Sequence, residues 1–339
     1  MQRADIINVL SKFAENFDFQ SAEYIEARTL AGHKNPWFIP EHVDLAMQHI
    51  LSAFLDKEKL ENFVTNYPEA GVQKSVGLVL SGNLPLVGFH DVLCVILSGH
   101  KAFIKPSSKD DVMLKFVLDQ FGKIELEFNE LWEFAERLND LDAYIATGSD
   151  NTARYFKAYF SGFPNIIRQN RNSVAVLTGN ETKEQLVDLG KDVFTYFGLG
   201  CRNVSKLLVP KGYDFQFLLD CWQENYAHYV MHSSYKNNYD YNYTIYLMNK
   251  MPFLMGGSVL LLENSSYASR IACLHYSQYE NQQAVFDELQ RDAEKIQCVV
   301  AGKELNWPGK VNFGETQIPQ LDQFADDIDT MKFLSQWSR

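Results

Sequence analysis

Residues 75–86 read Ser-Val-Gly-Leu-Val-Leu-Ser-Gly-Asn-Leu-Pro-Leu. The first six are almost continuously apolar, which is typical of a strand buried on both faces of a parallel sheet. The polar, glycine-containing segment after them predicts a turn at the carboxyl end of that strand. An apolar helix is expected to follow and to run to about Leu97, so the segment reads as strand, turn and helix.

The same succession recurs along the chain. Residues 102–104 and 142–146 are the next two expected strands, and each leads into a polar turn and a helix. Ligands bind at the carboxyl ends of the strands in sheets of this kind. The βαβ rhythm therefore predicts a Rossmann-like α/β unit, although the Gly-x-Gly-x-x-Gly fingerprint is missing from the sequence. Helical patterns over residues 4–17 and from Pro40 onward precede it.

A second α/β unit is expected after the first. Its helices should cover residues 182–196, 215–230 and 282–296, and its strands residues 173–177, 207–209, 259–262, 273–276 and 298–301. Residues 226–246 are rich in tyrosine and asparagine, and we interpret them as a surface or interface segment.

Composition and charge exclude several classes of protein. The chain has 339 residues and a net charge of −12, which argues against a nucleic-acid partner. Its five cysteines do not show metal-ligand spacing, so neither a metal site nor a disulfide framework is expected. Acidic residues interrupt the apolar pattern at the N-terminus, and no apolar run is long enough to span a bilayer. These features predict a cytoplasmic protein.

One cysteine has an unusual setting. Cys201 lies in Gly198-Leu199-Gly200-Cys201-Arg202, between a helical segment and a short apolar strand, whereas the other four cysteines lie in apolar or strand-like stretches. Glycines let a backbone approach a bound group closely, and a nearby cation raises the thiolate fraction of a thiol. Cys201 is therefore the candidate nucleophile, and the other four are interpreted as buried.

Four motifs at expected strand ends resemble the aldehyde dehydrogenase superfamily. In chain order they are Asn83-Leu84-Pro85-Leu86, Lys105-Pro106-Ser107, Thr147-Gly148-Ser149 and Gly198-Leu199-Gly200-Cys201. The Ser-Gly-Asn-Leu-Pro segment, with the tail residues Gln317 and Pro319 and the Ala-Asp-x-x-Asp-Thr run at 325–330, is most similar to the acyl-CoA reductase branch, which supplies fatty aldehyde in bacterial bioluminescence.

The resemblance implies an α/β fold of two Rossmann-like domains with an active-site cleft between them. We expect an N-terminal helical segment (1–66) packed on a nucleotide-binding domain (67–172), and then a catalytic domain (173–312) that carries Cys201. The C-terminal tail (313–339) should return to the first domain or to a partner subunit, because members of the superfamily often form homodimers.

The implied activity is acyl-CoA reduction. Cys201 would take the acyl group from acyl-CoA or another acyl thioester, a nicotinamide hydride would reduce the acyl-cysteine to an aldehyde, and the amide of Asn83 would bind the oxyanion. The implied cofactor-binding residues are Lys105, Ser107, Ser108, Gly148 and Ser149. The neutral Ser108 stands where NAD-preferring relatives often carry glutamate, which favours NADPH, with NADH as the other option.

Two departures from the family pattern bear on the chemistry. Leu199 replaces the usual glutamine, and Arg168 replaces the glutamate that activates water in hydrolysing relatives. The loss of that base fits reduction of a thioester. Arg168, Arg171 and Arg202 are interpreted either as ligands of coenzyme A phosphates or as surface ion pairs. His228 and His232 are interpreted as structural or as proton donors.

Three other functions are compatible with the sequence. A related reductase could act on a small acyl group, and an acyl-transfer enzyme could use Cys201 without hydride chemistry. A non-catalytic relative could serve as a partner subunit, with an inert Cys201 and no nucleotide binding.

Overall fold

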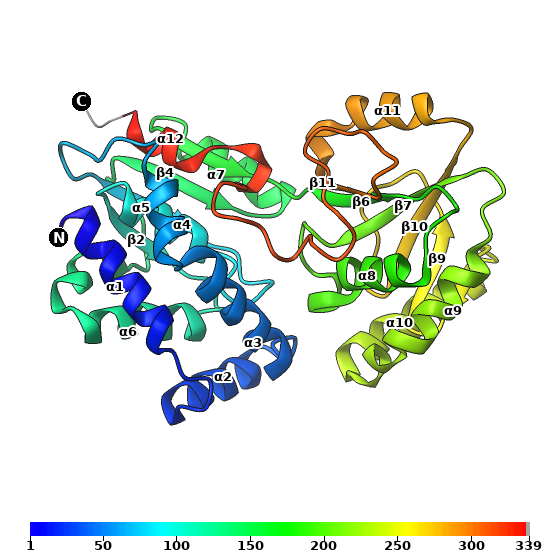
Figure 1. Cartoon of the computed structure of the whole chain (residues 1–339), viewed down its shortest axis with the longest axis horizontal. Helices are drawn as coiled ribbons and strands as arrows, with labels where there is room; N and C mark the ends of the chain where they lie inside the picture. The colour runs from blue at the N-terminus through cyan, green and yellow to red at the C-terminus, as the bar shows by residue number, and fades with distance from the viewer. Residues whose placement is uncertain (337–339) are drawn as a thin grey trace. The chain divides into compact units, whose positions relative to one another are not determined.

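The computed structural model describes residues 1–336 and divides into two compact units (Figure 1). Unit 1 comprises residues 1–170 and 319–336, and unit 2 comprises residues 171–318. Within the described residues, no helix is both long enough and apolar enough to cross a bilayer.

Unit 1 is built on a five-stranded, all-parallel sheet with the order β3-β2-β1-β4-β5. Its strands are β1 (Ser75–Val79), β2 (Lys101–Lys105), β3 (Trp132–Phe134), β4 (Ala143–Thr147) and β5 (Asn165–Arg168). Val76 pairs with Ala102 on one side and with Ala143 on the other, and all three side chains are fully buried. The predicted buried parallel strand at residues 75–80 is confirmed.

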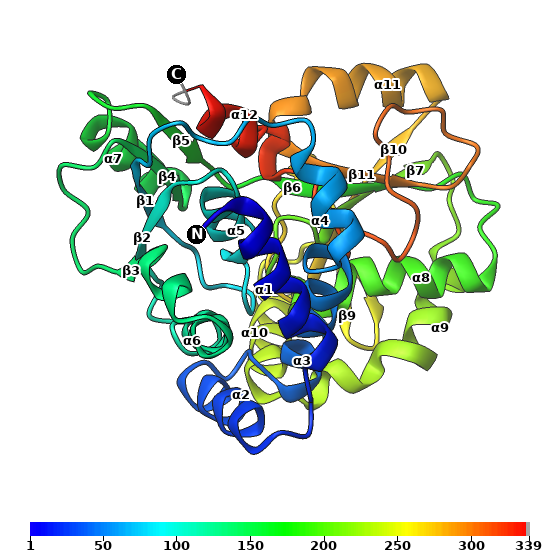
Figure 2. The same cartoon turned by 60° about the vertical axis from the view of Figure 1, so that its left-hand side comes forward.

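Helices cover this sheet and close its core. They are α1 (Arg3–Asn16), α2 (Ala22–Lys34), α3 (Pro40–His49), α4 (Lys57–Val64), α5 (Phe89–Leu97), α6 (Val112–Ile124), α7 (Asp150–Tyr159) and α12 (Thr330–Ser335). α1 packs on α4, α5 and α6 through its apolar face, and Figure 2 shows it beside α4 and α5. α3 begins at Pro40, as predicted, and continues as one turn of π-helix over Ile50–Phe54.

Helices α2 and α4 lie within the predicted N-terminal helical segment (1–66) but were not predicted individually. In α2 and α4, polar residues interrupt the apolar pattern, and only a few side chains of each helix are buried. Local capping defines where they begin: the Ser21 hydroxyl accepts from the amide of Tyr24, and the Asp56 carboxylate accepts from the amide of Lys59.

Unit 2 contains a six-stranded sheet with the order β11-β6-β7-β10-β9-β8. Its strands are β6 (Asn172–Val176), β7 (Val204–Pro210), β8 (Leu254–Gly256), β9 (Val259–Glu263), β10 (Cys273–Tyr279) and β11 (Ile296–Ala301). All neighbouring pairs are parallel except β8 with β9. Its helices are α8 (Lys183–Phe194), α9 (Phe215–Tyr226), α10 (Ser233–Met248) and α11 (Gln282–Arg291).

The tyrosine-rich segment of unit 2 is more ordered than its composition suggested. Residues 233–248 form the helix α10, a conformation that was not predicted for this surface or interface segment. Tyr235, Asn242 and Tyr246 are buried along it, and the Tyr235 hydroxyl donates to the carbonyl of Ser258 at 2.8 Å. Tertiary packing of these three side chains therefore outweighs the low helix propensity of tyrosine and asparagine.

The C-terminal tail is fixed to unit 1 by buried polar contacts. Arg168, at the end of β5, is 4% exposed, and its guanidinium forms an ion pair with Asp91 on α5. The same guanidinium donates to the Thr330 hydroxyl at 2.8 Å, and the Tyr67 hydroxyl donates to the Asp329 carboxylate at 3.0 Å. The acidic run at 325–330 thus anchors the first turn of α12.

We predict that Arg168→Ala destabilises unit 1 by about 3–5 kcal/mol, because removing one partner leaves Asp91 as an uncompensated buried charge. Hydrogen exchange should accelerate in α5 and α12. The matched control is Lys115→Ala, which removes only the exposed pair between Lys115 and Asp119 on α6. Equal melting temperatures for the two variants would contradict this assignment.

Candidate functional site

The loops after β1 and β2 carry four of the predicted site residues. Asn83 is half-buried in the first loop, and its Oδ1 accepts from the Ser81 hydroxyl at 3.0 Å, which orients the amide. Lys105 is the last residue of β2 and is exposed, Ser107 is half-buried and Ser108 is exposed. A lysine with its ammonium group in solvent at a strand end is available to a polar ligand.

The two loops are in close contact at Gly82. A Cβ added to Gly82 would lie 2.6 Å from the Cβ of Ser107, which is too close for any side chain. Glycine is therefore required where the β1 loop crosses the β2 loop. The structure brings Asn83 and Ser107 into neighbouring positions within unit 1.

The third predicted turn follows β4, on the other side of β1. Ser149 caps α7, where its Oγ accepts from the amide of Thr152 at 3.4 Å. Gly148 precedes it, and a Cβ there would lie 3.0 Å from Thr152. The N-terminus of a helix with a close-packed glycine before it presents backbone N–H groups to an anion.

These three loops fit a dinucleotide cofactor. The crossover direction of the sheet reverses at β1, since β2 and β4 lie on opposite sides of it. Such a switch point leaves room between adjacent loops at the carboxyl ends of the strands, and dinucleotides bind there. Lys105 and Ser107 on one side and Gly148 and Ser149 on the other are the residues that could hold the ribose and phosphate groups of such a cofactor.

Cys201 lies in unit 2, in the turn that enters β7. It is exposed, whereas the other four cysteines are buried, as predicted. The chain reaches it through three successive left-handed residues: Tyr196 (φ 54°), Phe197 (φ 58°) and Gly198 (φ 73°). Left-handed backbone costs roughly 1–2 kcal/mol for a non-glycine residue, so the surrounding packing must stabilise this turn.

Asn203 provides much of that stabilisation. It is 2% exposed, and its Oδ1 accepts from the amide of Gly200 at 2.8 Å. Its Nδ2 donates to the carbonyls of Thr195 at 2.8 Å and Asp192 at 3.0 Å. One buried amide therefore links the end of α8 to the residues on both sides of Cys201.

Strand β6 and a set of aromatic rings hold the turn from other sides. The Ser173 hydroxyl donates to the carbonyl of Cys201 at 2.9 Å. The Phe197 ring is 4.4 Å from the ring of His232 and 5.4 Å from that of Tyr229, between centroids. Behind the turn is a cavity of about 50 Å³, lined in part by Phe197, Gly200 and Tyr235. The thiol-bearing turn is thus rigidly supported within unit 2.

The basic residues differ from expectation. The interpretation of Arg168 as a phosphate ligand or surface ion pair is wrong, because it is buried against Asp91. Arg171 donates to the carbonyl of Ile296 at 3.5 Å, and Arg202 donates to Sγ of Cys298 at 3.5 Å. His232 has a structural role, because its Nδ1 accepts from the amide of Tyr235 at the start of α10.

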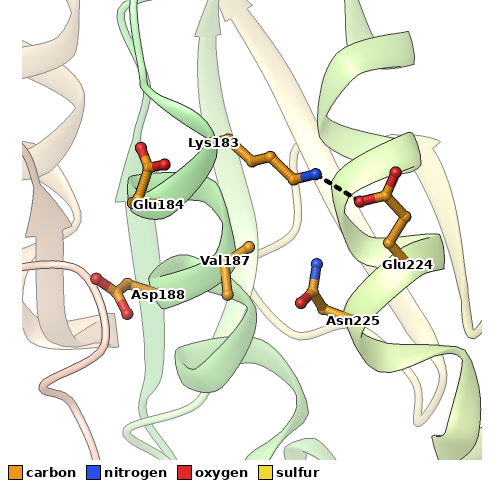
Figure 3. Close-up of a pocket in the computed structure, with 6 residues that line it drawn as sticks. All are labelled: Lys183, Glu184, Val187, Asp188, Glu224 and Asn225. Atoms are coloured by element: carbon orange, nitrogen blue, oxygen red, sulfur yellow. Dashed lines mark hydrogen bonds and ion pairs between the residues drawn. The ribbon is translucent and has the colours of Figure 1, made fainter.

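Another hollow lies elsewhere in unit 2, between α8 and α9. It has a volume of about 360 Å³ and is crossed by an ion pair from Lys183 to Glu224 at 2.6 Å, as Figure 3 shows. Lys183 begins α8, whereas Cys201 follows the opposite end of that helix. None of the predicted site residues lines this hollow.

Three buried polar residues that support the site were not predicted. Asn203 braces the Cys201 turn, Asp192 accepts from the amides of Gly314 and Thr316, and Asp110 accepts from the amide of Leu86. Asp110 and Asn203 follow predicted motif residues by a few positions, which is the available sequence signal. Their burial became evident only in the folded structure.

Comparison with known proteins identifies the family. A family model described as "Acyl-CoA reductase (LuxC)" matches residues 5–209, which is more than half of the chain. This match confirms the predicted resemblance. None of the curated protein sequences matches the chain.

Solved structures share the fold. Aldehyde dehydrogenase 21 from Physcomitrella patens, in complex with the reaction product succinate, is 14% identical with a TM-score of 0.69, over 98% of this chain and 83% of that chain. An NAD+ complex of an aldehyde dehydrogenase from Bacillus cereus is 12% identical with a TM-score of 0.65, over 90% and 73%. At these identities the likeness establishes the fold alone, and the predicted aldehyde dehydrogenase-like fold is confirmed.

We predict that Asn203→Ala lowers the free energy of unfolding of unit 2 by about 1–3 kcal/mol, because the Gly200 amide loses its buried partner. Amides of residues 196–204 should exchange faster with solvent. Asn203→Asp keeps the acceptor but places a buried carboxylate against the two carbonyl oxygens that Nδ2 contacts, so it should be at least as destabilised as the alanine variant. Unchanged exchange in the alanine variant would show that the turn does not depend on this side chain.

Proposed function

Since this chain belongs to the LuxC family of acyl-CoA reductases, we propose that Cys201 is its nucleophile and that it reduces an acyl thioester to the aldehyde with NADPH. The observation that carries the assignment is the position of Cys201. Among the five cysteines, all within the described residues, Cys201 is the exposed one, and it lies on a turn braced by Asn203 and Ser173.

The first step is acyl transfer to the protein. The Cys201 thiolate attacks the thioester carbonyl, the carbon–sulfur bond to coenzyme A breaks, and coenzyme A leaves as a thiolate that takes up a proton. The product is an acyl-cysteine at Cys201. A nicotinamide cofactor, when bound, would supply the hydride to the acyl carbon, and cleavage of the bond to Sγ of Cys201 would then release the aldehyde and restore the Cys201 thiolate.

Asn83 is proposed to stabilise the oxyanion formed during acyl transfer. Its Oδ1 is engaged by the Ser81 hydroxyl, so the amide group is oriented before substrate arrives. A preoriented donor costs no reorganisation when negative charge develops on the carbonyl oxygen. The backbone N–H of Cys201 is the proposed second donor.

The β2 and β4 loops are proposed to bind the cofactor. Lys105 and Ser107 would contact the adenosine ribose, while Gly148 and Ser149 would contact phosphate at the start of α7. Ser108 is exposed and uncharged, and therefore would not repel a 2′-phosphate. This absence of repulsion supports NADPH over NADH.

Reduction is favoured over hydrolysis by the state of Arg168. This residue stands where hydrolysing relatives of the superfamily carry a general base, and here it is a cation buried in an ion pair with Asp91. An arginine remains protonated and cannot accept a proton from water. An acyl-cysteine therefore lacks a base at this position that would activate water against it.

We also propose that the protein is cytoplasmic and homodimeric. No disulfide links any of the five cysteines, all of which lie in the described part of the chain, and this fits a reducing compartment. An apolar surface suited to a second copy lies at edge strand β8, where Met248, Met251, Leu254 and Met255 are exposed.

The test of function is oxidation of NADPH by wild-type protein with a panel of acyl-CoAs, beside two variants. Cys201→Ser should abolish turnover. Asn83→Ala should lower kcat about a hundredfold, because it removes one oxyanion donor. Acylation of Cys201 without NADPH consumption would instead support acyl transfer. The absence of turnover, acylation and nucleotide binding would support a non-catalytic partner.

Cofactor choice is tested at one residue. Ser108→Glu should lower the ratio of kcat/KM for NADPH over NADH about tenfold or more, because a carboxylate near the 2′-phosphate is repulsive. Ser108→Ala is the neutral control and should leave the ratio unchanged. If the glutamate variant keeps the wild-type ratio, Ser108 does not face the ribose.

A further inference from the structure

We propose that Asp110 is a positioning residue that joins the cofactor loop after β2 to the Asn83 loop after β1, so that cofactor binding orders the oxyanion donor. The inference rests on the proposed function for the roles of Lys105 and Asn83. It concerns a buried residue that is not among the substrate and cofactor contacts proposed above.

The first link runs from Asp110 to the Asn83 loop. Oδ2 of Asp110 accepts a hydrogen bond from the backbone amide of Leu86 at 2.7 Å. Leu86 has a φ of 58°, in the left-handed region that a leucine rarely adopts. The buried carboxylate therefore holds in place a strained residue within the Asn83 loop, which connects β1 to α5.

The second link runs from Asp110 to the cofactor loop. Its backbone amide donates to the carbonyl of Ser107 at 3.0 Å, which closes a turn over residues 107–110. The Ser107 hydroxyl in turn accepts from the amide of Lys109 at 3.3 Å. A single residue is thus bonded to both loops, through its side chain to one and its backbone to the other.

Close packing strengthens the connection. The position of a Cβ on Gly82 would lie 2.6 Å from the Cβ of Ser107 and 3.1 Å from the amide nitrogen of Asp110. Gly82 directly precedes Asn83. Since there is no room between the loops, a displacement of Ser107 is transmitted to Asn83 unless the contact opens.

Burying the Asp110 carboxylate between the two loops is energetically unfavourable. Asp110 is 6% exposed, and its Oδ1 has no hydrogen-bond partner. Burial raises the pKa of the Asp110 carboxyl to about 7, against the opposing effect of the Leu86 amide, and Asp111 raises it further. Because the folded pKa is above the ordinary value, ionisation of this group lowers stability as pH rises toward and through 7. Its contribution is therefore one of geometry rather than net stability.

The consequence is a coupling between two functions of unit 1. A ribose bound by Lys105 and Ser107 restricts the β2 loop, and Asp110 passes that restriction to Leu86 and Asn83. Cofactor binding then orders the Asn83 loop before the thioester reacts, and the free energy of cofactor binding offsets the entropy that this ordering costs.

Hydrogen exchange tests the coupling without requiring turnover. In wild-type protein, saturating NADPH should slow amide exchange in both 81–88 and 105–112. In Asp110→Ala, the protection should be confined to 105–112. Asn83→Ala should keep protection in both segments, because it leaves Asp110 and Leu86 in place. Protection of both segments in Asp110→Ala would overturn the proposal, as would protection of neither in wild type.

Conservative and neighbouring variants separate positioning from a folding defect. Asp110→Asn keeps an acceptor for the Leu86 amide and should restore the two-segment protection, even if the alanine variant is too unstable to measure. Asp111→Ala breaks the exposed pair with Lys34 but leaves both hydrogen bonds of Asp110 in place, so its exchange should resemble that of wild type. Failure of Asp110→Asn to restore protection while it remains folded would contradict the proposal.

Enzyme kinetics provide a second test of the coupling, and they distinguish its failure from failure of the proposed reductase function. Asp110→Ala should both raise the Kd for NADPH and lower kcat, and its effect on kcat should be mostly absent in an Asn83→Ala background. Fully additive losses in kcat would overturn the coupling. If wild type reduces no acyl-CoA yet NADPH protects both segments through Asp110, the proposed function fails while this inference stands.

Discussion

The parallel pairing of β1 with both β2 and β4 is the constraint on which unit 1 depends. Parallel strands run in one direction, so every loop that leaves a carboxyl end emerges at the same edge of the sheet. Asn83, Lys105 and Ser149 lie far apart in the chain but share that edge for this reason. The reversal of crossover direction at β1 then leaves space between two of the loops. The strand order, more than any single motif, creates the place where we propose that a dinucleotide binds.

Buried polar groups convert this framework into fixed loop geometry. Asp192 accepts from the amides of Gly314 and Thr316, and burial raises the pKa of its carboxyl to about 6. Its own carbonyl accepts from Asn203, so a single residue links the chain after β11 to the Cys201 turn. Buried charges seldom add net stability. They do exclude alternative arrangements, because any other loop conformation would leave these groups without partners.

How much of this could be predicted depended on the range of the interaction. The β1 strand and the helix from Pro40 were predictable because periodicity and proline act locally. α10 was not, because tyrosine and asparagine are weak helix formers and its helix depends on packing of distant residues. Arg168 was singled out from the sequence, but its interpretation as a phosphate ligand or a surface ion pair was wrong. Its partners Asp91 and Thr330 lie 77 and 162 positions away, so the local sequence pattern around Arg168 could not predict them.

The five cysteines show how the same chain separates one exposed thiol from four buried ones. Burial raises the pKa of Cys94, Cys221 and Cys273, so these thiols stay protonated and act as small apolar side chains. Cys201 is exposed instead, and it follows a turn in which residues 196–198 have left-handed backbone conformations. The strain of that turn is sustained by Asn203 and by packing around Phe197. Selectivity among thiols therefore follows from where the backbone bends, and the chemistry proposed for this protein requires that bend to be held rigidly.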